Sequence, residues 1–354
     1  MNTILPVLHG VRAVLTRAYE ARKLRRAQFL SNRLAAPELA DLQSTSRHVM
    51  GTTAAGVKTI LASIDGHAGP AAKRGAMLAE LLQAELELMA SRVTRLGLRT
   101  AAVISGTRTL GRDAIARLAQ GDDSDLQRAP ERTSISIGSI AQRVAAQASE
   151  SKADLVVADA GRRKLVARFF RQDLASEILR HCRRPLLFAA TTPQSAYRHV
   201  LVAIDFSAAA SDAARLAIAL APQARFTFVH AVRMQDEDVM LELGLPREII
   251  RLFRKKACET GREKLQYLAA RLGVAPQAVT HVVEHGSVEH VISSCARRTG
   301  ADLVCVGKRE QSWFKERLTG SVASRLLRMS RADLLVVPQR GTHDVAADED
   351  TVLL

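Results

Sequence analysis

The chain reads Ile60-Leu61-Ala62-Ser63-Ile64-Asp65 in one place and Val200-Leu201-Val202-Ala203-Ile204-Asp205 in another, and these two stretches decide its fold. Each is a short apolar run that ends in aspartate, which is typical of a strand buried on both faces of a sheet. An alanine-rich stretch with helical character follows each run, over about 71–83 and 208–221. A second apolar run then begins at the same distance from each aspartate, at Ala84 and Ala224. The chain therefore contains an internal repeat.

The repeat continues in its second part with an offset of 148 residues. Gly138-Ser139-Ile140 corresponds to Gly286-Ser287-Val288, and the run 153–157 corresponds to 301–305. Each half therefore predicts the order β-α-β-α-β-α-β-α-β, which favours a parallel sheet joined by right-handed crossovers. The halves differ in the middle, where the second half has a long helical stretch over 246–272 and the first half only a shorter, polar one.

We therefore predict an α/β fold of two tandem doubly wound domains, each with a five-stranded parallel sheet. The predicted domains span 58–193 and 194–340, with a linker around 191–198. The last strand of each, Leu186 to Ala190 and Leu334 to Val337, is a strongly apolar sheet edge. Since an exposed apolar edge promotes association, we expect these two edges to pair and to join the halves as a pseudo-dimer.

Two segments lie outside the repeat. Residues 1–57 form a basic extension with eight Arg or Lys and three Asp or Glu, and Val7, Val11 and Val14 fall on one helical face. Residues 1–30 therefore predict a helix that contacts a protein partner or an anionic membrane surface, or one that docks on the protein's own domains. Residues 341–354 form an acidic tail that we expect to be disordered.

Composition narrows the classes of function. The 354 residues carry a net charge of +15, a balance that invites nucleic acid or anionic membrane as a partner. The charge is spread out, however, and no helix-turn-helix, zinc-finger or aromatic RNA-binding signature is present, so no specific nucleic-acid partner is expected. The four cysteines show no C-x-x-C pair and no zinc spacing. No apolar run reaches the roughly 18 residues that span a bilayer, and no signal-peptide pattern is found, so we expect a cytoplasmic protein.

One stretch of the second half carries chemistry. It follows the fourth predicted strand, where the chain reads Gly307-Lys308-Arg309-Glu310 and, after nine more residues, Gly320-Ser321-Val322. Backbone N–H groups at a helix start bind phosphate, and glycine lets a phosphate approach the backbone closely. Lys308 and Arg309 add positive charge, and Ser321 adds a hydroxyl donor. The stretch therefore predicts a phosphate-binding loop.

The first strand of the same half supplies a second element of this site. In an open doubly wound sheet, ligands bind beyond the carboxyl ends of the strands, where the strand order reverses. Asp205 ends the first strand. If that strand neighbours the fourth, Asp205 and Gly307 flank one crevice, and Asp205 would accept a hydrogen bond from a ribose hydroxyl or the adenine amine.

These parts together resemble the universal stress protein family. Its ATP-binding members carry G-x-x-G-x9-G-[S/T] after the fourth strand and an aspartate at the end of the first, and Gly307, Gly320, Ser321 and Asp205 stand at those places. The resemblance covers 59–190 and 197–340, and it implies an adenine nucleotide alpha hydrolase-like fold that binds ATP, with Mg²⁺. It implies nucleotide contacts from Asp205, Phe206, Ser207, Val229, Gly307, Lys308, Gly320, Ser321 and Val322.

The sequence departs from the family pattern in both halves. Glu310 stands at the second glycine, where a carboxylate repels phosphate and does not easily adopt positive φ. In the first half, Asp159, Arg162, Gln172 and Asp173 stand at the loop positions, so the three glycines and the serine are gone. We therefore predict at most one ATP per chain, in the second half.

Three functions remain open at this point. The first is an ATP-responsive stress protein whose bound state is read by a partner. The second is a nucleotide-free tandem scaffold that acts through its surface. The third is a slow ATPase, but no Walker loop, nucleophile elbow or general base is found in the sequence.

Overall fold

The structure is a computed structural model, and it describes residues 56–64, 69–95, 101–127, 129–160, 174–233, 241, 247–308, 322–329 and 331–339. The chain divides into two compact units. One consists of Ala54–Arg233 and Arg254–Leu354 and contains the whole sheet. The other consists of Met1–Thr53 and Met234–Phe253, of which the structure describes Leu241 and the start of one helix. The basic extension 1–57 lies outside the described residues apart from its last two, and so does the acidic tail 341–354.

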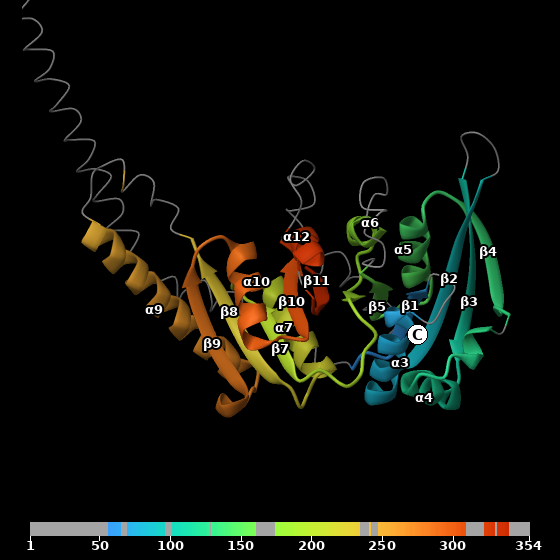
Figure 1. Cartoon of the computed structure of the whole chain (residues 1–354), viewed down its shortest axis with the longest axis horizontal. Helices are drawn as coiled ribbons and strands as arrows, with labels where there is room; N and C mark the ends of the chain where they lie inside the picture. The colour runs from blue at the N-terminus through green and yellow to red at the C-terminus, as the bar shows by residue number, and fades with distance from the viewer. Residues whose placement is uncertain are drawn as a thin grey trace, which may run out of the picture. The chain divides into compact units, whose positions relative to one another are not determined.

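The first half of the repeat contains six strands and four α-helices among its described residues (Figure 1). In chain order they are β1 (Thr59–Ile64), α3 (Pro70–Leu82), β2 (Glu85–Arg95), β3 (Ala101–Leu110), α4 (Arg112–Gln120), β4 (Arg132–Ile137), α5 (Ile140–Glu150), β5 (Leu155–Asp159), α6 (Leu174–His181) and β6 (Leu186–Ala189). Ser139 precedes α5 as its N-cap residue and forms a capping box with Gln142, which satisfies two N–H groups at the helix start.

The second half contains five strands among its described residues (Figure 1). In chain order its elements are β7 (His199–Ala203), α7 (Ala208–Leu220), β8 (Arg225–Val232), α9 (Arg247–Arg271), β9 (Val279–His285), α10 (Val288–Thr299), β10 (Leu303–Lys308), α12 (Val322–Met329) and β11 (Asp333–Pro338). The long helix predicted over 246–272 is therefore confirmed as α9. Within the described residues, no helix is long and apolar enough to cross a membrane.

All eleven strands lie in one sheet, in the order β4-β3-β2-β1-β5-β6-β11-β10-β7-β8-β9. In the second half every neighbouring pair is parallel, and the strand order reverses between β7 and β10, which confirms the predicted doubly wound fold. The two halves meet where β6 pairs antiparallel with β11, with Leu187 opposite Leu335. The predicted pairing of the two apolar edges is confirmed.

The five-stranded parallel sheet predicted for the first half is wrong in one respect. The described part of this half has six strands, because β3 lies between β2 and β4 and is antiparallel to both. The stretch interpreted as a shorter, polar helix contains β3 and the nine-residue helix α4. β4 corresponds to β9 of the second half. Since β3 lies beside β2, β4 is displaced outward by one position in the sheet.

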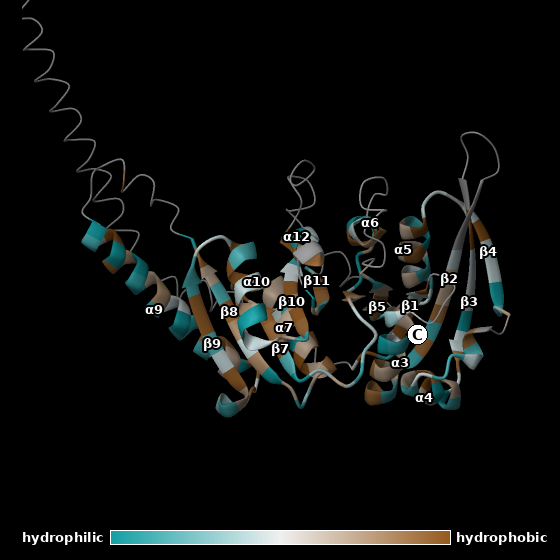
Figure 2. Cartoon of the chain, viewed as in Figure 1, coloured by the Kyte–Doolittle hydropathy of each residue, from teal (hydrophilic) through white to brown (hydrophobic). Residues whose placement is uncertain are grey.

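Small side chains hold the helices close to both faces of the sheet. On one face, alanines of α3 and α7 are fully buried against β1, β7 and β8. On the other face, α5, α6, α10 and α12 cover the same strands through a second buried cluster. The central strands therefore carry mostly hydrophobic residues, while α9 mixes hydrophilic and hydrophobic ones (Figure 2). This burial on both faces is what places polar groups at the strand ends.

Candidate functional site

The carboxyl ends of β7 and β10 lie side by side. These two strands are parallel neighbours, with Ala203 opposite Val306. Asp205 lies two residues after Ala203, and Gly307 lies directly after Val306. Both residues are therefore at the point where the strand order reverses. The neighbouring strands that the crevice requires are therefore present, and the strand ends form the candidate site.

Asp205 organises the turn from β7 into α7. Its Oδ1 accepts hydrogen bonds from the Ser207 backbone N–H at 3.0 Å and from the Ser207 hydroxyl at 2.5 Å. Ser207 is the N-cap of α7, and its Oγ accepts from the Ala210 N–H at 3.2 Å. Phe206 between them has φ of 62°, in the left-handed region that a non-glycine residue adopts only at some cost. The turn is held in one conformation with the exposed Asp205 side chain at its edge.

An aromatic and basic group lies beside this turn, and sequence reasoning missed it. The ring centroids of Phe206 and His230 are 4.6 Å apart, and the Lys264 ammonium lies 5.7 Å from the centre of the Phe206 ring. His230 Nδ1 lies 2.7 Å from the Ile204 carbonyl, so Nδ1 carries the proton and donates to it. Burial lowers the pKa of His230, so the ring is neutral at pH 7. The feature of the sequence that could have identified His230 is its position in β8, directly after Val229.

Val229, which was predicted to contact a nucleotide, lies in the buried part of β8. Its side chain is 1% exposed and packs in the cluster with Leu201 and Val304. Its carbonyl accepts the Ile204 N–H at 2.8 Å. Side chains alternate along a strand, so Val229 and His230 face opposite sides of the sheet. Val229 therefore supports the strand ends through packing, and its contact with a nucleotide stays a prediction.

Gly307 is required by the fold itself. A Cβ at this position would lie 2.5 Å from the Ala209 carbonyl carbon and 2.5 Å from the Ala210 nitrogen. These are backbone atoms in the first turn of α7, and they cannot rotate away as a side chain does. The close approach that this glycine permits in the structure is that of α7, and its contact with a phosphate stays a prediction.

Lys308 is directed at the first half of the chain. Its Nζ donates to the Leu179 carbonyl at 3.0 Å, in the last turn of α6. Carbonyls in the last turn of a helix lack partners within the helix, and a lysine there is favourable for the helix dipole. Lys308 was predicted to bind phosphate, and in this structure its ammonium contacts the end of α6.

The remaining predicted contacts fall around the start of α12. Val322 begins that helix, and the side chains of its residues Ala323 and Leu326 are buried. Arg325 forms an ion pair with Glu289 of α10 at 2.7 Å. Residues 309–321 lie outside the described residues, and they include Glu310, Trp313, Gly320 and Ser321.

The corresponding place in the first half holds an internal carboxylate. Asp159 ends β5, and its Oδ1 accepts the Ala71 N–H at 2.8 Å in the first turn of α3. A Cβ on Gly69 would lie 2.5 Å from Asp159 Oδ2, so the carboxylate sits directly against the chain that enters α3. The helix start that faces this strand end is thus already bonded to an anion of the protein. Asp65, Arg162, Gln172 and Asp173 lie outside the described residues.

Comparison with known proteins identifies the family. A model of the universal stress protein family matches residues 196–338, which contain all five strands of the second half. Universal stress protein YxiE of Bacillus subtilis is 30% identical over 149 residues, which is 40% of this chain and 99% of that protein. The chain belongs to the universal stress protein family. Universal stress protein G of Shigella flexneri is 28% identical over 109 residues, 31% of this chain and 76% of that protein.

Solved structures agree with this universal stress protein in fold. A functionally unknown protein from Pseudomonas aeruginosa PAO1 has a TM-score of 0.54 at 18% identity, and covers 84% of this chain and 97% of its own. A universal stress protein from Archaeoglobus fulgidus has a TM-score of 0.50 at 13% identity, and covers 80% of this chain and 98% of its own. At these identities the likeness establishes the fold alone. The resemblance predicted from Asp205 and the Gly307–Ser321 spacing is confirmed at the level of the family.

Proposed function

We propose that this stress-response protein binds ATP or a related adenine nucleotide at the carboxyl ends of β7 and β10, and that a partner reads the bound state. The observation that carries the proposal is the parallel pairing of β7 with β10 at the reversal of strand order. Crevices of this kind are the usual ligand sites of open α/β sheets. Family membership and the spacing of Gly307, Gly320 and Ser321 support a nucleotide as the ligand.

Each described group has a part in this proposal. The exposed Asp205 carboxylate would accept a ribose hydroxyl or the adenine amine, and its bonds to Ser207 hold it in place for that contact. The N–H groups at the start of α12, together with Gly320 and Ser321, would bind the phosphates, because a helix start favours anions. Mg²⁺ would enter with the phosphates. Lys308 would have to leave the Leu179 carbonyl in order to reach them.

The first half is proposed to bind no nucleotide in this manner. Asp159 places its own carboxylate at the start of α3, and a phosphate there would meet a like charge. Arg162, Gln172 and Asp173 stand where the family loop has two of its glycines and its serine, and this also supports the absence of a nucleotide site in this half. One site per chain is therefore the expected stoichiometry.

A nucleotide-free scaffold is the second candidate, and two observations favour it. Gly307 is explained by the close approach of α7, and Asp205 by the turn that it forms with Ser207. Both residues would be kept in a protein that binds no nucleotide. A slow ATPase ranks below these two, because no group that would activate water has been assigned.

The test is to release bound small molecules from the purified full chain with acid and to separate them by liquid chromatography. We expect an adenine nucleotide at up to one equivalent per chain, and we expect Asp205→Ala to lose it. Asp212→Ala is the matched control, because Asp212 lies on α7 and pairs with Arg215 at 2.8 Å. If neither the native chain nor the chain incubated with ATP retains any nucleotide, the scaffold is the correct function.

A further inference from the structure

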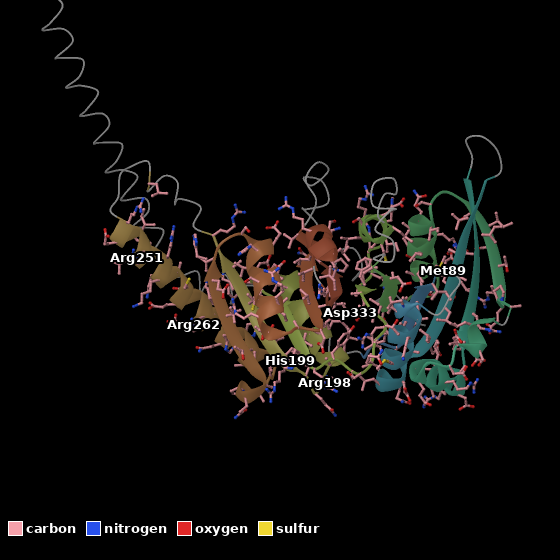
Figure 3. The ribbon with its side chains drawn as sticks, in the orientation of Figure 1. Met89, Arg198, His199, Arg251, Arg262 and Asp333 are labelled. Atoms are coloured by element: carbon pink, nitrogen blue, oxygen red, sulfur yellow. The ribbon has the colours of Figure 1, made fainter. Side chains whose placement is uncertain are left out.

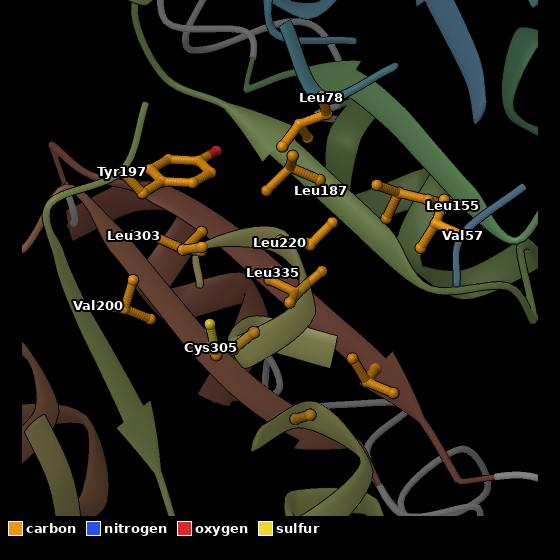
Figure 4. Packing of buried hydrophobic residues seen from close by; sticks show 14 of the residues in the cluster. Val57, Leu78, Leu155, Leu187, Tyr197, Val200, Leu220, Leu303, Cys305 and Leu335 are labelled. Carbon is orange, nitrogen blue, oxygen red and sulfur yellow. The ribbon is translucent and has the colours of Figure 1, made fainter. Parts of the chain in front are cut away.

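A buried polar network crosses the seam between the two halves. Arg74 of α3 donates from Nε to Asp333 Oδ2 at 2.9 Å, and the side chains are 8% and 4% exposed. The Tyr197 hydroxyl donates to the same Oδ2 at 2.7 Å. The Arg74 guanidinium also stacks over the Tyr197 ring, 4.0 Å from its centre. Asp333 lies at this seam in Figure 3, and Figure 4 shows Tyr197 beside the paired strands.

The two halves contribute different parts of this network. Asp333 and Tyr197 belong to the second half, and Arg74 belongs to the first half. The N–H of Ala190, at the end of the first half, donates to Asp333 Oδ1 at 2.8 Å. Arg74 Nη1 also donates to the Ser195 carbonyl at 3.1 Å in the linker. Asp333 is therefore the acceptor for three donors, and its only described cation comes from the other half.

Among the described residues the repeat has no second copy of this network. The two parallel pairings Val156–Leu186 and Val304–Leu334 place Pro185 at the position that corresponds to Asp333. Arg74 is the fifth residue of the 13-residue helix α3, and the fifth residue of the 13-residue helix α7 is Asp212. The edges are alike in their apolar residues and unlike in these charged ones.

This asymmetry matters because both edges are able to pair with themselves. The strands β6 and β11 are short, apolar and related by the repeat, and their antiparallel pairing is centred on Leu187 opposite Leu335. If β11 of one chain paired with β11 of a second copy in the same register, Leu335 would face its own counterpart. Asp333 would then lose its ion pair with Arg74. Asp212 of the second copy would occupy the position that Arg74 has in the pairing of β6 with β11. If β6 paired with β6, Arg74 would face Pro185 and would be a buried cation without a carboxylate.

We propose that the Arg74–Asp333 pair determines the partner of each sheet edge, so that β11 accepts β6 and rejects the β11 edge of a second copy. Removing one member of a buried ion pair leaves an uncompensated charge, which is strongly unfavourable, whereas replacing both members with neutral groups is often tolerated. The pair therefore acts mainly against the wrong partners. Its contribution to the stability of the correct pairing is the smaller effect.

The test uses the full chain with a cysteine reporter at the centre of the edge. Leu335→Cys is introduced with Cys305→Ala, because Cys305 lies beside Leu335 in the sheet. A disulfide between two chains at residue 335 then reports pairing of β11 with β11. The chains are refolded from denaturant at increasing protein concentration under mild oxidation, and the same protein without Leu335→Cys corrects for the other cysteines.

The decisive variant is Arg74→Met with Asp333→Asn, which removes both charges and keeps an acceptor for Ala190 and Tyr197. We expect at least about tenfold more covalent dimer than in the native network at the same concentration. The matched control is Arg117→Met with Asp125→Asn, which removes an ion pair of 2.6 Å elsewhere in the first half. The linker between the halves is the same in all of these variants, so a difference in dimer yield reports the effect of the network alone.

Arg74→Lys separates charge from packing, because it retains the cation, and it should give the native level of dimer. It also provides the readout if the double variant does not fold, since Arg74→Met alone should then give more dimer than Arg74→Lys. The proposal is overturned if the charge-free variants and the Arg117→Met/Asp125→Asn control give equal yields at every concentration, including no dimer in any of them.

Discussion

Gly307→Ala separates two roles of this glycine, which is the second-to-last residue of β10. The added methyl would lie 2.5 Å from two backbone atoms of Ala209 and Ala210, a distance that real Cβ atoms essentially never show. Either β10 or the first turn of α7 must therefore move. Because α7 begins directly after the Asp205 turn, the strain falls on the candidate site as well as on the core.

The size of the effect follows from this contact. Overpacking a well-packed region costs about 1–3 kcal/mol, and a clash with backbone belongs at the upper end because no side chain can rotate away. Alanine also restricts the unfolded chain, which returns about 0.4–1 kcal/mol. We therefore expect a net loss of about 2–2.5 kcal/mol, with the thermal midpoint lowered by several degrees.

The assay is the thermal midpoint of the full chain by differential scanning calorimetry, with Gly56→Ala as the control. Nothing lies within 4 Å of a Cβ at Gly56, so this substitution should leave the midpoint unchanged or raise it slightly. If Gly307→Ala is as stable as Gly56→Ala, the close approach of α7 does not explain the glycine. Loss of ATP binding without loss of stability would restore a direct role in phosphate binding.

Three further predictions concern the same half. Glu310→Gly should tighten ATP binding severalfold in titration calorimetry, because it removes a charge that repels phosphate, and an unchanged affinity would place Glu310 away from the phosphates. Trp313 lies in the same stretch, so its fluorescence should change and saturate as ATP is added; a flat signal alongside calorimetric binding would mean that this stretch is rigid or is not the site. Burial lowers the pKa of His230, so the unfolded chain takes up a proton first as the pH falls through about 6.5, and stability should decrease there. His230→Gln should reduce that decrease in the thermal midpoint, and an unaltered pH dependence would contradict the assignment.

Most of the fold could be predicted because the sheet is buried on both faces. Apolar runs that end in aspartate marked β1 and β7, and the offset of 148 residues matched the later strands. The hairpin that contains β3 was missed for a physical reason. Buried and less buried positions alternate along β3, and Val103, Ser105 and Thr107 are buried on one face, so two of these three buried side chains are polar. The polar character suggested a helix, whereas the alternation and the β-branched residues indicated a strand.

The contacts that sequence could not predict join distant parts of the chain. Arg74 and Asp333 are 259 positions apart, and no local pattern indicates that they meet. The repeat matched Asp333 to Pro185 as equivalent positions, although their difference breaks the symmetry of the seam. The sequence indicates that another group approaches the backbone closely at Gly307, but it does not tell whether that group is a ligand or a helix. His230 was missed because its role depends on the Ile204 carbonyl across the strand pair.

Isothermal titration of the full chain with ATP and Mg²⁺ is the most direct test of nucleotide binding by the second half. We expect saturable binding with a stoichiometry near one per chain. Gly320→Leu should abolish that binding while leaving the far-ultraviolet circular dichroism intact, because the phosphates would lose their approach to the backbone. Two equal sites per chain would contradict the asymmetry between Asp159 and Gly307, and full binding by Gly320→Leu would show that the nucleotide lies elsewhere.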